Sequence, residues 1–243
     1  MKKLIIIGKG RVAKQCFSIA KEFLKPKFSE LIDYELSTKE LDAKFNALKN
    51  HLIISANNFY LFKAPCVKNN TIINYHNALL PRHRGVNAHI WAIFKGDKKS
   101  GISWHFVDEC IDTGRILTQK EIPLNDKITA HELLSMQHKL AINSLKESLE
   151  KLKLGFKGFL GTGGGDYHFK KDLPNKALLN LAWDESKISR FLRSMNLGIF
   201  DTIRPKIKLF GEEVELSSYE FIKDELRLNL SNNLNLIIKK EKK

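Results

Sequence analysis

The chain has 243 residues, of which 43% are hydrophobic, and its formal net charge at neutral pH is +14. This length and hydrophobicity are enough for a substantial buried core, which excludes a disordered chain. No apolar run reaches the roughly 18 residues of a membrane span, and the apolar run at 4–7 is too short for a secretory signal. The lysines are spread along the chain, so we expect a solvated basic surface and a basic tail, KKEKK, at 239–243.

Apolar runs alternate with segments of helical period through the first half of the chain. This alternation predicts strands and helices in turn, with strands at 4–8, 31–36, 52–56 and 71–75 and helices at 12–24, 38–48 and 87–94. Continuous apolar strands separated by helices are typical of a mostly parallel sheet that is covered on both faces. The sequence therefore predicts an α/β fold, a Rossmann-like sheet with flanking helices.

Patterns in the second half of the sequence indicate where this first domain ends. A strand is expected at 101–108, a strand that returns antiparallel at 115–124, and a long amphipathic helix at 130–152. The glycine-dense stretch LGTGGGDYH at 160–168 indicates a boundary, so we predict one domain over 1–158 and a small β-rich module over 159–243. That module should contain one helix, at 184–195, and strands over 206–221 and 225–240 with tight turns at Gly211 and Asn232.

Two glycine patterns invite a nucleotide-binding interpretation. GKGRVA at 8–13 has the G-x-G-x-x-A form between a strand and a helix, which would suit an NAD(P)-dependent oxidoreductase. The acidic residue expected further on could only be Asp33 or Glu35, and neither lies cleanly at a strand end, so a simple tight turn is favoured. The run at 161–165 lacks the lysine of a phosphate-binding loop, which favours a connector.

Metal and redox chemistry find little support in the sequence. The histidines match no familiar zinc spacing and have no partner cysteines; they include His76, His83, His89 and His105. The three cysteines are widely spaced and odd in number, namely Cys16, Cys66 and Cys110. We therefore expect no metal and a reducing compartment, the cytoplasm.

Polar residues stand where two neighbouring strands end. NYHNALLPRHRG at 74–85 brings Asn74 and His76 to the end of one apolar strand, and WHFVDECIDTG at 104–114 brings Asp112 to the loop after the next. Because the ends of neighbouring parallel strands lie on one rim, the three side chains are expected to meet. Each alone has an ordinary explanation: an amide that satisfies the backbone, a core histidine and a turn aspartate.

Together these stretches resemble the core of the folate-dependent formyltransferases. That family includes methionyl-tRNA formyltransferase, glycinamide ribonucleotide formyltransferase and the sugar-nucleotide N-formyltransferases. Its signature is N-x-H, then L-L-P-x-x-R-G, then D-x-G; here Asp112 follows His76 by 36 residues, 112 minus 76. The resemblance is close over about residues 50–125.

The resemblance implies that Asn74, His76 and Asp112 are the catalytic set. An amine would attack the formyl carbon of 10-formyltetrahydrofolate, and Asn74 and His76 would hydrogen-bond the formyl oxygen. Asp112 would orient His76 and hold a water that relays protons. Neither a metal nor a covalent enzyme intermediate is needed.

The resemblance also assigns binding residues. The folate should be held largely by main-chain groups of 57–62 and 108–112, which gives Asn57, Phe59, Tyr60, Leu61, Asp108 and Ile111. Ordinary burial in the core is the alternative for 59–62. The loop over the formyl group would be shaped by Pro81, Arg84 and Gly85.

The stretch YHFKKDLPNKALLNLAWDESKI at 167–188 resembles the segment that follows the catalytic domain in sugar-nucleotide N-formyltransferases. This likeness predicts a nucleotide-linked amino sugar as the acceptor, in particular dTDP-4-amino-4,6-dideoxyglucose for a bacterial surface polysaccharide such as the O-antigen. It also predicts a homodimer. The candidate substrate contacts are Arg84, His168, Lys170, Lys171 and Trp183.

Four alternatives stay open. Methionyl-tRNA formylation gains from the positive charge, but such an enzyme is expected to carry a complete barrel-like domain after the catalytic domain. A glycinamide ribonucleotide enzyme is expected to lack the final module. Outside this family, an NAD(P)-dependent oxidoreductase would use GKGRVA, and a noncatalytic nucleic-acid binder would make Asn74, His76 and Asp112 coincidental.

Overall fold

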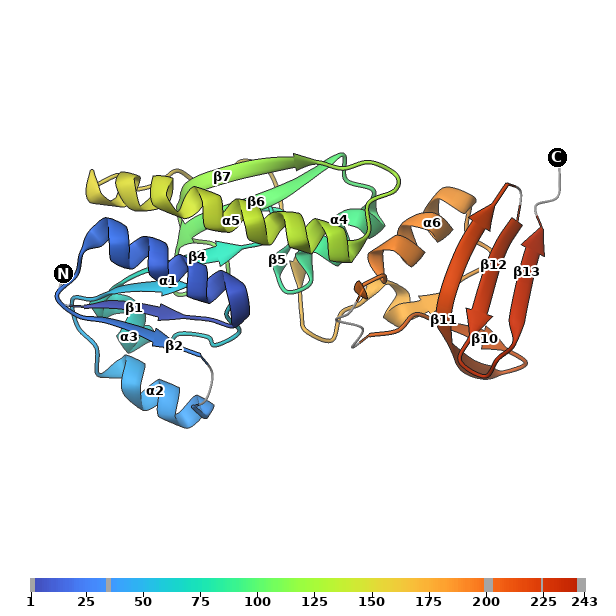
Figure 1. Ribbon diagram of the computed structural model, residues 1–243, viewed down its shortest axis with the longest axis horizontal. Helices are drawn as coiled ribbons and strands as arrows, with labels where there is room; N and C mark the ends of the chain where they lie inside the picture. The colour runs from blue at the N-terminus through green and yellow to red at the C-terminus, as the bar shows by residue number, and fades with distance from the viewer. Residues whose placement is uncertain (1–2, 34–35, 199–202, 224, 240–243) are drawn as a thin grey trace. The chain divides into compact units, whose positions relative to one another are not determined.

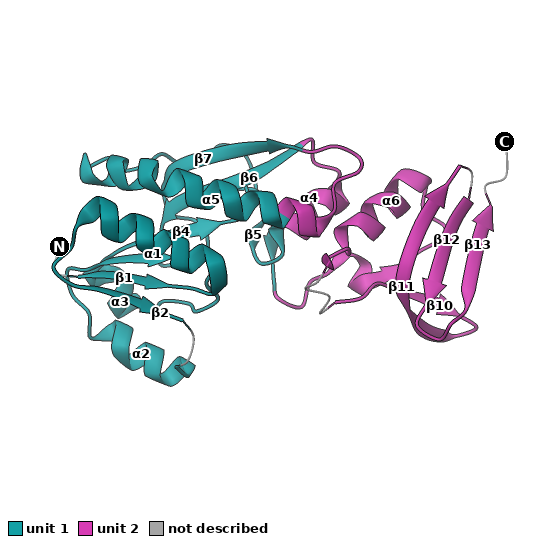
Figure 2. Ribbon diagram, viewed as in Figure 1, with its two compact units in different colours: residues 1–88, 99–123, 134–169 teal, residues 89–98, 124–133, 170–243 magenta. Residues whose placement is uncertain are grey.

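The structure is a computed structural model that describes residues 3–33, 36–198, 203–223 and 225–239. The chain forms two compact units, shown in two colours in Figure 2. Unit 1 combines residues 1–88, 99–123 and 134–169, and unit 2 combines residues 89–98, 124–133 and 170–243. Each unit is built on its own main sheet, so the two are described separately. The domain boundary at 158 stays a prediction.

Unit 1 is built on a six-stranded sheet with the strand order β2-β1-β3-β4-β6-β7 (Figure 1). Its strands are β1 (Leu4–Ile7), β2 (Ser29–Ile32), β3 (Leu52–Ser55), β4 (Thr71–His76), β6 (Lys99–Phe106) and β7 (Ile116–Pro123). The pairs among β1, β2, β3 and β4 are parallel, whereas β6 runs antiparallel to both β4 and β7. The predicted α/β fold with a mostly parallel sheet is confirmed.

Helices cover both faces of this sheet (Figure 1). Helices α1 (Gly10–Leu24) and α5 (Ala130–Lys153) lie over one face, and α2 (Thr38–Asn46) and α3 (Ala64–Asn69) lie over the other. Because neither face meets water, all four residues of β1 are buried, which explains the uninterrupted apolar run at its position. Helix α2 begins at a capping box in which the Ser37 N–H donates to the Glu40 carboxylate at 2.8 Å and the Glu40 N–H donates to Ser37 Oγ at 3.3 Å.

Several predicted bounds differ from the structure. Strand β2 lies at Ser29–Ile32 and not at 31–36, of which residues 34–35 lie outside the described residues. Strand β6 begins at Lys99 and ends at Phe106, two residues earlier than predicted at each end. Helix α3 was not predicted, because six residues give too few turns for a hydrophobic period to show.

Unit 2 contains a five-stranded sheet with the order β13-β12-β11-β10-β9. Its strands are β9 (Leu178–Leu179), β10 (Lys206–Leu209), β11 (Glu212–Ile222), β12 (Glu225–Leu230) and β13 (Asn235–Lys239). Turns at Gly211 and Asn232 join the antiparallel strands as predicted. A short 3-10 helix, η1 (Pro174–Ala177), precedes β9.

The helices of unit 2 meet in an aromatic cluster. Helix α4 (Ala88–Lys95) lies in this unit from residue 89 onward. Helix α6 (Glu185–Ser194) is capped by Asp184, whose side chain accepts from the Lys187 backbone N–H at 2.8 Å. Phe94 of α4 packs against Trp183 and Phe191, with ring centroids 5.9 and 6.3 Å away. Both helices were predicted. No helix in the described part of the chain is long and apolar enough to cross a membrane.

Candidate active site

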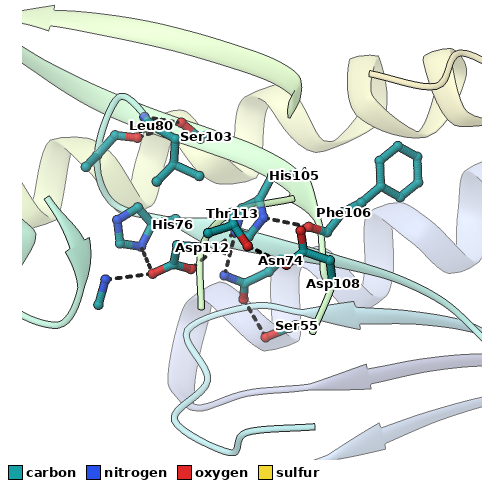
Figure 3. A network of polar contacts seen from close by, with 12 residues as sticks. Ser55, Asn74, His76, Leu80, Ser103, His105, Phe106, Asp108, Asp112 and Thr113 are labelled. Atoms are coloured by element: carbon teal, nitrogen blue, oxygen red, sulfur yellow. Dashed lines mark hydrogen bonds and ion pairs between the residues drawn. The ribbon is translucent and has the colours of Figure 1, made fainter. Parts of the chain in front are cut away.

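A row of polar side chains crosses three neighbouring strands of unit 1 (Figure 3). Ser55 at the end of β3 is paired with Asn74 of β4, and Asn74 is paired with His105 of β6. Side chains at directly paired positions lie on the same face of a sheet. His76 and Ser103, two positions further along β4 and β6, are also a pair and lie on this face as well. The strand register therefore gathers these residues from three distant parts of the sequence.

Hydrogen bonds run along this row in one direction. The Asn58 side-chain amide donates to Ser55 Oγ at 2.9 Å, and Ser55 Oγ donates to Asn74 Oδ1 at 2.6 Å. The Asn74 amide nitrogen then lies 3.1 Å from Nε2 of His105, whose Nδ1 donates to the Phe106 carbonyl at 2.7 Å. A carbonyl only accepts, so Nδ1 of His105 carries the hydrogen and Nε2 accepts from Asn74. The chain of donors fixes the orientation of the Asn74 amide.

Asp112 reaches this row by a route that the sequence analysis did not predict. A parallel arrangement of the two strands was expected, but β6 is antiparallel to β4, so its end lies beside Ile73 rather than beside His76. The loop after β6 folds back over the strands, closed by a 2.9 Å hydrogen bond from the Phe106 N–H to the Arg115 carbonyl. Asp112 adopts a left-handed φ of 55°, which aims its carboxylate at the histidines.

The glycine of the D-x-G motif, Gly114, is required where the loop after β6 folds back. A Cβ at Gly114 would lie 1.8 Å from the Phe106 carbonyl oxygen, so no side chain fits there. Within the loop, the Thr113 hydroxyl donates to Asp108 at 2.6 Å. These contacts make the loop a defined structure that presents Asp112 to the row.

The Asp112 carboxylate lies between two imidazole rings. Its Oδ2 is 3.4 Å from Nδ1 of His76, and its Oδ1 is 3.4 Å from Nε2 of His105. Both distances exceed those of an ordinary hydrogen bond, so the contacts are electrostatic. The close hydrogen bond to this carboxylate comes from the backbone N–H of Gly85, at 2.8 Å.

His76 is held by the loop that follows it. Its Nε2 is 2.9 Å from the carbonyl oxygen of His83, and since a carbonyl only accepts, Nε2 carries the hydrogen. In the neutral ring, Nδ1 then has a lone pair that faces Asp112. The geometry thus places a proton acceptor of His76 directly beside a carboxylate.

Burial and charge act in opposite directions on this pair. Burial lowers the pKa of His76 below its ordinary value and outweighs the attraction of Asp112, which raises it. Burial alone would raise the pKa of Asp112, but the positive charge of His76 and His105 in their protonated forms, together with the Gly85 N–H, holds it well below its usual range. Asp112 is therefore a carboxylate and His76 a neutral ring at neutral pH.

A cavity of about 180 Å³ opens beside Asp112. Its walls combine apolar and polar groups, from Leu80, Pro81, Arg84, Asp112, Thr113, Gly114, Ile116, Leu160 and Gly161. The Nε atom of Arg84 is buried without a hydrogen-bond partner among the described residues. A polar group of a bound molecule would therefore find both an anion and an unsatisfied donor among the residues around this cavity.

The residues expected to hold a folate divide into exposed and buried ones. The side chains of Phe59 and Leu61 are 70% and 59% exposed, whereas Tyr60 is buried and donates to Asp42 at 2.8 Å. Asn57 is half-buried and donates to the Lys9 carbonyl. In the second segment, Asp108 and Ile111 are both exposed.

The residues expected to contact the acceptor belong to different parts of the molecule. Arg84 lines the cavity beside Asp112, and His168 is buried against His83 with stacked rings, 5.4 Å between centroids. Lys170 and Lys171 are exposed residues of unit 2. Trp183, also of unit 2, is half-buried and lies under the Lys187 ammonium, 4.6 Å from its ring centroid. Of these residues, Arg84 is the one that lines the described cavity of unit 1.

Sequence reasoning missed His105 and Ser55. His105 was considered only as one of several possible zinc ligands, although the alternation of Ser103, Trp104 and His105 contains the signal. Two polar residues flanking a tryptophan in a strand must share one face. Ser55 had no such signal, because its role follows from the parallel register of β3 with β4.

Residues 8–149 match the family described as formyl transferase, which is more than half of the chain. The chain belongs to the formyl transferase family. The matched region contains Asn74, His76, His105 and Asp112, so the polar row lies within the part of the chain that carries the family's pattern.

Curated relatives of this formyl transferase include sugar-directed and tRNA-directed enzymes. A GDP-perosamine N-formyltransferase of Brucella melitensis is 37% identical over 123 residues, which cover 51% of this chain and 47% of the relative. A methionyl-tRNA formyltransferase of Clostridioides difficile is 31% identical over 127 residues, covering 52% of this chain and 40% of the relative. The matches thus span less than half the length of these relatives.

Solved structures extend the similarity of fold to nearly the whole formyl transferase chain. A sugar N-formyltransferase from a Shewanella species has a TM-score of 0.73 at 22% identity, covering 92% of this chain and 100% of its own. An N-formyltransferase of Helicobacter canadensis, solved in complex with folinic acid and dTDP-3-aminofucose, has a TM-score of 0.70 at 18% identity. It covers 99% of this chain and 100% of its own. At these identities the likeness establishes the fold.

Proposed function

We propose that this protein transfers the formyl group of 10-formyltetrahydrofolate to the amine of a nucleotide-linked amino sugar. The observation that supports this most is the cluster in which Asp112 contacts His76 directly and Asn74 through His105, with Asp112 lining a cavity, all within the region that matches the family. Among similar proteins, one is named for GDP-perosamine and another was solved with dTDP-3-aminofucose, both nucleotide-linked amino sugars.

The finer proposal concerns the acceptor and its use. We propose dTDP-4-amino-4,6-dideoxyglucose as the acceptor, formylated by a cytoplasmic homodimer for a surface polysaccharide such as the O-antigen. The basic balance of the chain, +14, is compatible with a substrate that carries a diphosphate. We propose Arg84, His168, Lys170, Lys171 and Trp183 as residues that serve the acceptor.

In the transfer, the acceptor nitrogen bonds to the formyl carbon, the bond from that carbon to N10 of the folate breaks, and one proton moves from the acceptor nitrogen to N10. Negative charge collects on the formyl oxygen in between. The Asn74 amide gives one hydrogen to His105 and has a second, which in this proposal stabilises that oxygen. Removing one such donor typically costs about 10² to 10³ in rate.

Asp112 and His76 would carry the proton. Asp112 lines the cavity and is ionised, so it meets the amine first, and the lone pair of His76 Nδ1 lies 3.4 Å behind it. The Nε2 hydrogen of His76 is engaged by the His83 carbonyl. Direct donation from His76 to the formyl oxygen therefore requires that hydrogen bond to open, and otherwise His76 acts through Asp112.

Several of the residues proposed to hold the folate have exposed apolar side chains, which a flat aromatic ligand could contact. Phe59 presents a ring that is 70% exposed, and Leu61 and Ile111 add apolar side chains that are 59% and 37% exposed. These exposed apolar side chains of unit 1 are accessible to a ligand. The main chain around them would hold the pterin, and the folate would supply the formyl group from its N10.

The decisive experiment incubates purified protein with 10-formyltetrahydrofolate and a panel of nucleotide-linked amino sugars, and follows the products by mass spectrometry. We expect one sugar nucleotide to gain one formyl group. Asp112→Asn should abolish most of this gain, whereas Asp33→Asn, which changes an exposed carboxylate in the same unit, should not. A folded wild-type protein that formylates no member of the panel would refute the proposal.

A second acceptor belongs in the same panel because two observations favour it. The charge of +14 suits a nucleic acid, and the Clostridioides difficile relative is a methionyl-tRNA formyltransferase. Formylation of methionyl-tRNA together with unmodified sugar nucleotides would replace the proposed acceptor with tRNA. The roles proposed for Asn74 and Asp112 would then stand unchanged.

A further inference from the structure

We propose that His83, Asp166 and His168 form a binding site for a divalent transition-metal ion, with Zn²⁺ the best match. Each residue offers one ligand atom, and these atoms all lie within 4.8 Å of one another. The nearest pair is Nδ1 of His83 and Nε2 of His168, 3.1 Å apart. All three residues belong to unit 1.

The backbone builds this cluster from two distant segments. Strand β5 (Arg84–Gly85) pairs in parallel with β8 (Tyr167–His168). The Arg84 N–H donates to the Asp166 carbonyl at 2.9 Å, and the Val86 N–H donates to the His168 carbonyl at 3.1 Å. Asp166 and His168 are two residues apart in an extended segment, so their side chains leave on the same side. His83 comes immediately before β5 and faces them.

A close approach of the two segments holds this arrangement. A Cβ at Gly165 would lie 1.6 Å from the Pro81 carbonyl oxygen, so glycine is required at this position. The glycine-rich run was expected to be a connector, and its last glycine instead packs against the LLPRHRG loop. The position of Asp166 and His168 relative to His83 is therefore set by the fold rather than by free side chains.

The donor set matches zinc, and so does the spacing of the two imidazole nitrogens. Zinc takes imidazole nitrogens and carboxylate oxygens in a tetrahedral arrangement. Two nitrogens bonded to one zinc at about 2.0–2.1 Å lie about 3.3 Å apart in that geometry, close to the separation of the two imidazoles here. His83 and His168 are 4% and 6% exposed, whereas Asp166 is exposed and keeps the site open to incoming ions. A water would complete four ligands.

The proposed site adjoins the polar row through the backbone. The His83 carbonyl accepts the Nε2 hydrogen of His76, and two residues later the Gly85 N–H donates to Asp112. An ion held by His83 and His168 would tie down the segment that makes both contacts. It would thus position His76 and Asp112 without touching a substrate, and His168, as a ligand of the ion, would serve the acceptor only indirectly. The binding claim itself does not depend on the proposed function.

Metal binding can be measured directly on the intact protein. The protein is stripped with a chelator and titrated with Zn²⁺ in competition with a chromophoric chelator, which gives the stoichiometry and Kd. We expect one high-affinity Zn²⁺ per chain and a higher Tm with Zn²⁺ than in chelator. Substitution of Co²⁺ should give the visible absorption of a tetrahedral site.

Three variants distinguish binding at this site from nonspecific binding of the metal by other histidines. His168→Gln should lose the high-affinity ion and the Tm shift, and Asp166→Asn should weaken binding at least about 10-fold. His138→Gln, which changes a partly buried histidine outside the cluster, should bind as wild type does. Asp166 is exposed, so its variant keeps the test valid even if His168→Gln fails to fold.

Two results would overturn the proposal. One is a wild-type protein that binds no Zn²⁺ with high affinity, which would leave the two imidazoles as a hydrogen-bonded pair. The other is equal binding by wild type, His168→Gln and Asp166→Asn, which would place the ion elsewhere. Since the readouts are binding and absorption, both results are independent of whether any sugar is formylated.

Discussion

The two faces of strands β4 and β6 carry side chains of opposite kinds. One face is packed under helices α1 and α5, with Ile73, Tyr75, Ile102 and Trp104. The other carries polar groups, with Asn74, His76, Ser103 and His105. Apolar and polar residues alternate along the same strands, so neighbours in sequence lie on opposite faces of the sheet.

The difference lies in how each face is satisfied. Apolar side chains gain from area removed from water, and many arrangements of similar volume give a similar gain. On the polar face, each nitrogen or oxygen has a partner at a defined distance, as between Ser55, Asn74 and His105. We therefore expect substitutions on the apolar face to reduce stability, and those on the polar face to reduce activity at nearly constant stability.

The largest effect should follow from Trp104→Ala on the apolar face. Trp104 is fully buried, and its Nε1 donates to the Ala141 carbonyl at 3.1 Å. We expect a loss of about 3–5 kcal/mol in the free energy of unfolding, measured by urea denaturation. Ile102→Val, a milder change on the same face, should cost about 0.5–1.5 kcal/mol and leave kcat unchanged. A Trp104→Ala protein of wild-type stability would break the comparison.

Asn74→Ala, on the polar face, should reduce activity rather than stability. It removes the amide hydrogen proposed to stabilise the formyl oxygen, so kcat should fall about 10² to 10³-fold. The urea midpoint should change far less than in Trp104→Ala. Steady-state kinetics with the acceptor found in the panel measure the first quantity. Wild-type kcat in a folded Asn74→Ala protein would show that this face is not the reactive one.

Ser55→Ala tests whether the row of hydrogen bonds matters beyond Asn74. The Ser55 hydroxyl fixes the Asn74 amide through a 2.6 Å hydrogen bond. A neutral hydrogen bond contributes about 0.5–1.5 kcal/mol, so kcat should fall up to about tenfold. KM for the folate should stay near its wild-type value, which separates positioning from binding. Ser55→Thr, which keeps the hydroxyl, should recover part of the rate.

The smallest expected effect is an acid sensitivity specific to the polar face. The pKa of Asp112 is lower in the folded protein than in the unfolded chain, where it is about 3.9. The ionised group therefore stabilises the fold above that pH, and the contribution is lost as pH falls towards the folded pKa. Urea midpoints at pH 6 and pH 3 should decline more steeply for wild type than for Asp112→Asn. Parallel declines would mean that Asp112 is not coupled to folding.

Much of the fold could be predicted because its signals are local. The buried strands β1, β3 and β4 are uninterrupted apolar runs, and α5 has a long helical period. The prediction of β2 was displaced because three of its four residues are only half-buried, which leaves a weak pattern at Ser29–Ile32. Local pattern fails where burial is partial.

The sequence could predict which motif residues make up the candidate site, but not which side chains contact one another. Asn74, His76 and Asp112 are recognisable from the motif, whereas the place of His105 between Asn74 and Asp112 depends on an antiparallel pairing. A single sequence does not fix the direction of a strand pair that is joined through a loop and a helix. For the same reason, the meeting of His83 with His168, through the pairing of β5 and β8, could not be read from spacing.

The most direct test of the central claim is transfer of a labelled formyl group. Wild type, Asp112→Asn and Asp33→Asn are given 10-formyltetrahydrofolate with an isotopically labelled formyl carbon and the acceptor, under single-turnover conditions. We predict that label appears on the acceptor amine with wild type and Asp33→Asn, and about 10² to 10⁴-fold more slowly with Asp112→Asn, although that variant still binds folate. Equal rates of transfer in all three folded proteins would contradict a reactive centre at Asp112.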